Sequence, residues 1–340
     1  MERIRIGTRG SKLALKQAAL VQEALLRAAG FAETELVILH TRGDRIQDKP
    51  LSEIGEKGVF ASELEQALLD GRIDAAVHSA KDLPMTLADG LEIAAVLPRA
   101  DVRDVLVIPK DGRMPSLRSP LACMQSDAGD SLFMGQLLQS GTESACTKIC
   151  GGTDSKGEIF RVGSGSRRRQ LLAGMLWENV ACENIRGNVD TRLRKLQEGG
   201  YDGIILAKAG LDRLGIGGEE GSDEEAFRFC PLSPKIFIPA ACQGMIAVET
   251  IRDTAVETLC RKVTDTETEL CFRVEREVLW QLAADCSEAA AAWCRQECDR
   301  LTLHAMYAGQ SVSLDCRANL QEGRLMAEQA AKLLKAKTES

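Results

Sequence analysis

The chain of 340 residues is long enough for two or three compact domains, and its hydrophobic content of 44% is ordinary for a globular protein. It contains no run of about 18 apolar residues, which argues against a transmembrane helix. The formal net charge of −7 argues against bulk binding of nucleic acid, because that function requires a basic surface. The N-terminus begins directly with a strand-like pattern instead of the apolar stretch of a signal peptide, so we expect a cytoplasmic protein.

The N-terminal part of the chain alternates between strand and helix patterns. Alternating apolar and polar residues predict a strand at 3–8, and an apolar stripe from Leu15 to Ala28 predicts a helix that Ser11 can cap. A second helix is predicted around Leu64. Further apolar runs predict strands at 35–41, 73–77 and 105–108. This alternation predicts a sheet built from βα units.

The stretch from about 111 to 158 breaks this pattern. It is rich in Gly, Ser, Asp and Pro and has little periodicity, which predicts an inserted or mobile loop. The acidic segment 219–225 is interpreted as a second, solvated loop. Beyond Ile159 the patterns predict helices at 168–176, 189–196, around 270–278 and at 324–335, and strands at 203–207, 301–305 and 311–314.

The 12 cysteines are scattered through the chain, and without an export signal we expect reduced thiols instead of a disulfide framework. Cys146 and Cys150 form one closely spaced pair, and Cys294 and Cys298 form another. Neither pair has the two-residue gap typical of zinc knuckles. We therefore predict no metal site and interpret most of the thiols as small buried side chains.

Polar groups follow several of the predicted strands. Arginine recurs beside glycine or serine in several of these segments. The segments are 7–11, 41–44, 78–84, 163–170 and 186–192. Ligands of open α/β sheets bind at the carboxyl ends of strands, and guanidinium groups bind carboxylates or phosphates bidentately. Each segment has a plainer alternative: the arginine triplet 167–169 also suits a solvated helix face, and His78 also suits a structural role.

Asp82 is a carboxylate among these cations. Its neighbours would keep it ionised, ready to stabilise a cationic intermediate or to relay a proton. The residues alone therefore predict an anion-binding α/β protein with one functional aspartate.

Longer motifs extend this interpretation. The matching stretches are Thr-Arg-Gly-Ser-Lys-Leu-Ala-Leu (8–15), Thr-Arg-Gly-Asp (41–44), Gly-Glu-Lys-Gly-Val-Phe (55–60), Asp-Ala-Ala-Val-His-Ser-Ala-Lys-Asp-Leu-Pro (74–84), Arg-Gly-Asn-Val-Asp-Thr-Arg-Leu (186–193), Tyr-Asp-Gly-Ile-Ile-Leu-Ala-Lys-Ala-Gly-Leu (201–211) and Pro-Ala-Ala-Cys-Gln-Gly (239–244). With them the chain resembles the porphobilinogen deaminase (hydroxymethylbilane synthase) family over residues 4–108 and 160–286. The resemblance implies a transferase of tetrapyrrole (haem) biosynthesis. Such an enzyme joins four porphobilinogen molecules head to tail on a covalent dipyrromethane cofactor, releases ammonia and hydrolyses the product to linear hydroxymethylbilane.

The resemblance also implies the architecture. We expect an α/β fold with two doubly wound domains like those of periplasmic binding proteins and a small α/β C-terminal domain. Domain 1 is predicted to comprise 1–97 and 236–255, domain 2 to comprise 98–235 with the insertion, and domain 3 to comprise 256–340. A monomer is expected, with porphobilinogen as its substrate and neither nucleic acid nor membrane as a partner.

The family's functional residues can be carried over position by position. Asp82 matches the catalytic aspartate, Cys286 matches the cysteine that holds dipyrromethane through a thioether, and Lys57 lies in the loop that covers the active site. Positions that match cofactor-binding residues are Lys81, Ser164, Ser166, Arg168, Arg169 and Gly187. Positions that match substrate-binding residues are Arg9, Ser11, Arg103, Arg186 and Arg192.

Three positions depart from the family pattern. Cys286 lacks the usual preceding Gly-Gly and the following Pro-containing segment, Arg167 replaces a usual Leu, and Cys242 replaces a usual Gly. The alternative function is a non-catalytic, two-lobed protein that binds a small anion. The Lys81-Asp82 pair and the spacing of Cys286 favour the enzyme.

Overall fold

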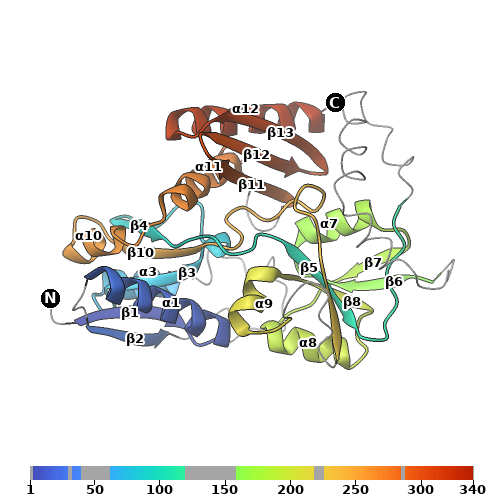
Figure 1. The fold of residues 1–340 in the computed structure, drawn as a ribbon, viewed down its shortest axis with the longest axis horizontal. Coiled ribbons are helices and arrows are strands. Elements are labelled where there is room, and N and C mark those ends of the chain that lie inside the picture. The colour runs from blue at the N-terminus through green and yellow to red at the C-terminus, as the bar shows by residue number, and fades with distance from the viewer. Residues whose placement is uncertain are drawn as a thin grey trace.

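The computed structural model describes residues 3–29, 33–39, 62–118, 158–217, 226–284 and 288–339. These residues form three separate sheets, each covered by helices (Figure 1). The motif 41–44, Lys57, most of the insertion with Cys146 and Cys150, the acidic segment 219–225 and Cys286 lie outside the described residues. Within the described ranges, no helix is both long and apolar enough to cross a bilayer.

The first sheet has the strand order β2-β1-β3-β10-β4. Its strands are β1 (Arg3–Arg9), β2 (Glu33–Leu39), β3 (Ala75–Ser79), β4 (Leu91–Val96) and β10 (Ile246–Ile251). Its helices are α1 (Lys12–Ala29), α3 (Ser62–Leu69) and α10 (Ala255–Arg261). Val21 of α1 packs on one face with Ile4 and Ile6 of β1, whereas Leu64 of α3 packs on the other with Ala76 of β3. Helices therefore cover both faces, because alternate strand residues point to opposite sides.

The second sheet repeats this design with the order β7-β6-β8-β5-β9. Its strands are β5 (Asp104–Pro109), β6 (Phe160–Gly163), β7 (Val180–Glu183), β8 (Gly203–Ala207) and β9 (Phe227–Pro231). Its helices are α7 (Arg167–Leu176), α8 (Val189–Gln197) and α9 (Lys208–Leu214). Leu172 of α7 belongs to the core on one side of the sheet and Leu196 of α8 to the core on the other. The two sheets confirm the predicted α/β fold with two doubly wound units.

The chain crosses between these sheets twice (Figure 1). It leaves β4 to enter the second sheet at β5, and it returns from β9 to the first sheet at β10. Each entering strand runs antiparallel to its neighbours: β5 to β8 and β9, and β10 to β3 and β4. The crossing segments 97–103 and 232–245 therefore connect the two units.

The third sheet is antiparallel, with β11 (Ala290–Glu297), β12 (Arg300–Tyr307) and β13 (Gln310–Arg317) in that order. Helices α11 (Thr266–Leu282) and α12 (Leu320–Glu339) contribute Val278 and Leu334 to the core that they share with it. Trp293 and Met306 instead belong to the core of the second sheet. The third unit thus lies above the other two and packs on both (Figure 1).

Local patterns located most elements, but not all of their ends. The strand expected at 73–77 begins two residues later, as β3 (Ala75–Ser79). The two residues before it belong to the preceding turn, where Ile73 is buried and Asp74 forms an ion pair with Arg5 at 2.7 Å. Strands β4, β6, β7, β9 and β10 and helices α9 and α10 were not predicted from local patterns. β11 was not predicted either, since its Ala-rich start has little strand propensity and its pairing with β12 forms the strand. α10 packs on the first sheet through Cys260, although the predicted domain 3 begins at 256.

Candidate active site

Asp82 lies on a short turn directly after β3, at the carboxyl end of the first sheet. The turn is the 3-10 helix η2 (Ala80–Asp82), and the Ala80 N–H donates to the Met245 carbonyl at 3.1 Å. Ser79 is held by Gln17 of α1, whose Nε2 donates to its hydroxyl at 2.9 Å. Leu83 is buried behind the turn, whereas Asp82 is exposed. The fold therefore presents this carboxylate from a fixed backbone.

Lys81 connects this turn to the second sheet. Its Nζ donates to Gln243 Oε1 at 3.4 Å, and Gln243 Nε2 donates to Asp104 Oδ1 at 3.0 Å. Gln243 lies on the returning crossing segment and Asp104 opens β5. Burial and Arg169 lower the pKa of Lys81 from 10.5 to about 8, against the opposing influence of Asp82 and Asp104. Residues from both units thus share one electrostatic environment.

Asp104 is fully buried between two arginines of α7. Arg168 Nη1 donates to its Oδ2 at 2.8 Å, and Arg169 Nη2 donates to its Oδ1 at 2.7 Å. Burial raises the pKa of this carboxyl, but the two guanidinium groups outweigh burial and hold the pKa well below its usual value. Asp104 therefore stays ionised and fixes both arginines.

The first turn of α7 places these arginines against its own helix dipole. Ser166 caps the helix by accepting from the Arg169 N–H at 3.4 Å, and the turn contains no acidic residue. Cations at the N-terminus of a helix interact unfavourably with the helix dipole. Arg168 and Arg169 therefore do not stabilise α7 by themselves. Pairing with Asp104 offsets that cost, and Arg169 also donates to the Ile205 carbonyl at 2.9 Å. The ion pairs with Asp104 therefore hold both arginines at the end of the sheet.

The segment before α8 supplies two further cations, Arg186 and Arg192. Gly187 between them has a φ of 110°, and a Cβ there would lie 2.6 Å from Thr191 Cγ2, so glycine is required for this turn. The Gly187 carbonyl accepts from Arg192 Nε at 2.8 Å. Burial, Arg169 and Arg186 lower the pKa of Arg192 to about 10, while Asp82 opposes them from the other unit.

Together these residues form what we call the cationic cluster. Its members are Lys81, Arg168, Arg169, Arg186 and Arg192, with the carboxylates of Asp82 and Asp104. The cations outnumber the carboxylates, and Asp104 neutralises only part of their charge. The cluster is therefore suited to a ligand with several carboxylate groups.

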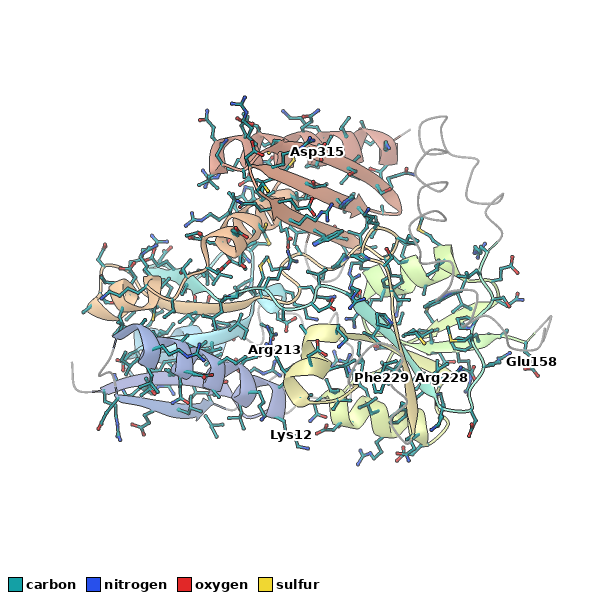
Figure 2. All side chains as sticks on the ribbon, viewed as in Figure 1. Lys12, Glu158, Arg213, Arg228, Phe229 and Asp315 are labelled. Atoms are coloured by element: carbon teal, nitrogen blue, oxygen red, sulfur yellow. The ribbon has the colours of Figure 1, made fainter. Side chains whose placement is uncertain are left out.

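Contacts between the two units flank the cluster. Lys12 Nζ of α1 lies 2.7 Å from Asp190 Oδ2 of α8. Arg213 Nη2 of α9 donates to the Gly244 carbonyl at 2.7 Å. Lys12 and Arg213 both lie where the two units meet (Figure 2).

The structure does not bring all predicted site residues into the cluster. Arg103 forms an ion pair with Asp101 at 2.7 Å, and both line a separate cavity. Ser11 accepts from the Ala14 N–H at 3.2 Å and so caps α1. Ser164 is buried and accepts from the Ser166 N–H at 3.3 Å, while Arg9 is half-buried at the end of β1. The ligand-binding roles of these residues stay predictions.

Sequence reasoning missed Asp104 and Gln243. Asp104 precedes an apolar run and gave no signal beyond being a carboxylate at the start of a strand. Gln243 lies within the quoted stretch 239–244, which was matched without a role. Only the tertiary structure shows that these two residues join Lys81 to Arg168 and Arg169.

Comparisons relate the chain to known proteins by sequence and by fold. The family model described as "Porphobilinogen deaminase, dipyromethane cofactor binding domain" matches residues 4–130 and 143–258. The porphobilinogen deaminase of Streptococcus sanguinis (strain SK36) is 36% identical over 338 residues, which cover 98% of this chain and 96% of the relative. That of Nitrobacter winogradskyi is 37% identical over 304 residues, which cover 88% of this chain and 81% of the relative. Among solved structures, the periplasmic aliphatic sulphonate binding protein SsuA from Escherichia coli aligns with 83% of this chain and 71% of its own, at a TM-score of 0.39 and 12% identity.

Proposed function

The chain belongs to the porphobilinogen deaminase family, and from this premise we propose that Asp82 and the cationic cluster form its active site. Its activity is that of a hydroxymethylbilane synthase. Four porphobilinogen molecules are condensed head to tail with release of ammonia, and hydrolysis yields linear hydroxymethylbilane. The observation that supports the site is the excess of cations over carboxylates around one exposed aspartate.

The described residues fit the family's dipyrromethane cofactor. Each of its pyrrole rings carries an acetate and a propionate, and the cluster offers several guanidinium groups for such carboxylates. The Nε of Arg168 is buried and has no hydrogen-bond partner among the described residues. When bound, the cofactor supplies the pyrrole carbon to which the first substrate is joined. We assign its carboxylates to Lys81, Ser164, Ser166, Arg168, Arg169 and Gly187, and its thioether to Cys286.

Asp82 acts on the substrate in this proposal. Loss of ammonia from the aminomethyl group of porphobilinogen leaves a methylene-pyrrole cation, which an ionised carboxylate stabilises. Exposure lets Asp82 reach the substrate, and the fixed η2 turn limits its reorganisation. Arg186 and Arg192 hold the substrate carboxylates on the opposite side of the site.

Arg9, Ser11 and Arg103 complete the proposed substrate-binding set, with Lys57 in the covering loop. Arg103 would have to exchange its Asp101 partner for a substrate carboxylate. An Arg103→Lys substitution tests this role: a point charge without the guanidinium fork should raise KM more than it changes kcat. An unchanged KM would mean that Arg103 pairs only with Asp101 and does not bind the substrate.

Asp82→Asn tests the proposal most directly. The variant should fold and keep a covalent dipyrromethane on its intact mass, yet turn over about a hundredfold more slowly or worse, since losing one such contact costs about 2.7–4 kcal/mol. Asp89→Asn is the matched control, because Asp89 is an exposed carboxylate on the loop that follows the same turn. Near-normal turnover by Asp82→Asn would contradict the assignment.

The alternative of a non-catalytic anion-binding protein is not favoured, because the family relationship covers most of the chain. The monomeric state, the cytoplasmic location and the domain boundaries at 97, 235 and 255 are further proposals. Light scattering of the purified protein tests the first, and limited proteolysis within 232–245 and 255–265 tests the last.

A further inference from the structure

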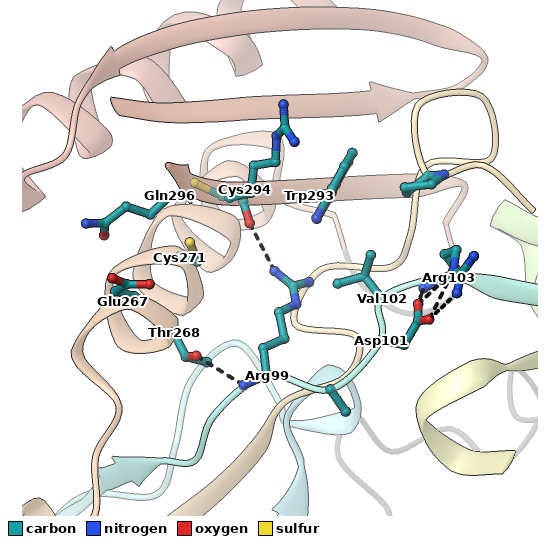
Figure 3. A pocket seen from close by; sticks show the side chains of 13 residues that line it. Arg99, Asp101, Val102, Arg103, Glu267, Thr268, Cys271, Trp293, Cys294 and Gln296 are labelled. Carbon is teal, nitrogen blue, oxygen red and sulfur yellow. Dashed lines mark hydrogen bonds and ion pairs between the residues drawn. The ribbon is translucent and has the colours of Figure 1, made fainter. Parts of the chain in front are cut away.

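Two thiols of the third unit lie side by side. Cys271 belongs to α11 and is 4% exposed, and Cys294 belongs to β11 and is 1% exposed. The two thiols lie close enough to interact with each other, and both line one cavity. Both sulfur atoms lie in the space between helix and strand (Figure 3). This pair has no part in the proposed catalytic cycle.

The backbones that carry the two thiols are tied together. Glu275, one helical turn after Cys271, accepts from the Cys294 N–H at 2.7 Å. The Cys294 carbonyl accepts from Arg99 Nη1 at 3.0 Å. A disulfide requires its two Cα atoms within roughly 4.4–6.8 Å, so a fixed helix–strand contact at this point favours closure.

A cavity of about 480 Å³ reaches both thiols. Cys271 and Cys294 line it together with Arg99, Thr268 and Gln296, among others (Figure 3). A molecule the size of hydrogen peroxide can therefore reach sulfur atoms that are otherwise buried. Cys260 is also buried but belongs to the core of the first sheet, where burial raises the pKa of its thiol to about 12.

We propose that Cys271 and Cys294 are a peroxide-sensitive thiol pair that closes to an intramolecular disulfide. The Cys271 thiolate attacks one oxygen of hydrogen peroxide, the O–O bond breaks, and the departing hydroxide takes up a proton to leave as water. The resulting Cys271 sulfenic acid is attacked by the sulfur of Cys294, and a second water leaves. Two thiols are oxidised, one peroxide is reduced, and the product bond joins α11 to β11.

The surroundings give the two thiols different roles. Contact with Cys271 and burial raise the pKa of Cys294 well above its ordinary value, so Cys294 keeps its proton. Arg99 lies close enough to Cys271 to interact with it electrostatically. Because Cys294 keeps its proton, we assign Cys271 as the attacking thiol and Cys294 as the resolving one.

The test is peptide mass mapping of the full-length protein after treatment with hydrogen peroxide and alkylation of the remaining thiols. We expect a crosslinked peptide joining 271 to 294 that has lost two hydrogens, and its disappearance after dithiothreitol. Cys260→Ser should leave this crosslink unchanged, since Cys260 lies elsewhere. Full alkylation of Cys271 and Cys294 in the peroxide-treated protein would overturn the proposal.

Single variants test the order of attack. In Cys294→Ser, a dimedone adduct of the sulfenic acid should accumulate on Cys271, whereas Cys271→Ser should give little adduct on Cys294. The reverse distribution would overturn the assigned roles. The mapping of the unsubstituted protein decides whether the disulfide forms even where a variant fails to fold.

Discussion

Two buried carboxylates, Asp104 and Glu275, show how the same kind of group serves two purposes in this molecule. Asp104 is shared by two guanidinium groups at the cationic cluster. Glu275 on α11 binds one guanidinium, that of Arg99, at 2.6 Å, and also accepts from the N–H groups of Cys242 and Cys294. The single charge of Asp104 therefore neutralises only one of its two guanidinium partners, whereas the charges of Glu275 and Arg99 neutralise each other.

The difference teaches which charge is available to a ligand. The Glu275 group joins the outgoing crossing segment, through Arg99, to the returning one, through Cys242, and both to the third unit. Its hydrogen bonds are used up in holding these parts together. The group around Asp104 lies at the carboxyl ends of strands and keeps an excess of cations, which is the requirement for binding carboxylates.

Removing either carboxylate should have the largest effect. Asp104→Asn and Glu275→Gln should each cost about 3–5 kcal/mol of unfolding free energy, because each leaves buried guanidinium charge uncompensated. Added succinate should restore the melting temperature of Asp104→Asn in part, since the cluster can take up a foreign carboxylate. It should not restore Glu275→Gln. Equal rescue of both variants in thermal unfolding would remove the distinction between the two groups.

Substitutions at Arg168 and Arg186 should separate stability from binding within the cluster. Arg168 is buried against Asp104, so Arg168→Leu should lower both the melting temperature and the amount of bound cofactor. Arg186→Leu should mainly weaken substrate binding, by about 1.5–3 kcal/mol or roughly 10–100-fold. The matched control is Arg167→Leu, because Arg167 is exposed on the same turn as Arg168. Steady-state kinetics and thermal unfolding of the three variants test this distinction. An Arg186→Leu variant with a lower melting temperature and an unchanged KM would contradict it.

Lys81 should give the smallest effect, and a dependence on pH. Its pKa is about 8 in the folded chain against 10.5 as its ordinary value, so between these pH values the unfolded chain holds a proton that the folded chain has lost. The contribution of Lys81 to the free energy of unfolding therefore increases as pH rises from about 8 to 10.5. At the same time the cluster loses one positive charge, and substrate affinity should fall by up to about tenfold as pH rises through 8. Lys81→Arg keeps its charge, so its KM should stay flat from pH 7 to 9.5, and a parallel fall in both proteins would exclude Lys81 as the cause.

The departures from the family pattern show what a sequence comparison alone leaves open. Cys242 stands where the family usually has Gly, and its φ of 61° lies in the left-handed region that favours glycine. Its N–H donates to Glu275, which holds the backbone in this conformation. Arg167, in place of the usual Leu, is exposed at the start of α7, so its side chain does not have to fit into the core. The sequence identified both changes, and the structure explains how each is accommodated.

The sequence by itself determined the first βα units and the polar segments at strand ends, and it predicted a functional role for Asp82. It could do so because the period of apolar residues and the glycine-containing turns are local properties of the chain. Only the tertiary structure decided which charges are neutralised within the protein. Asp104 and Arg168 are 64 residues apart, and Asp104 and Gln243 are 139 residues apart. Such pairs form because two sheets and two crossing segments pack together, and no local pattern encodes that contact.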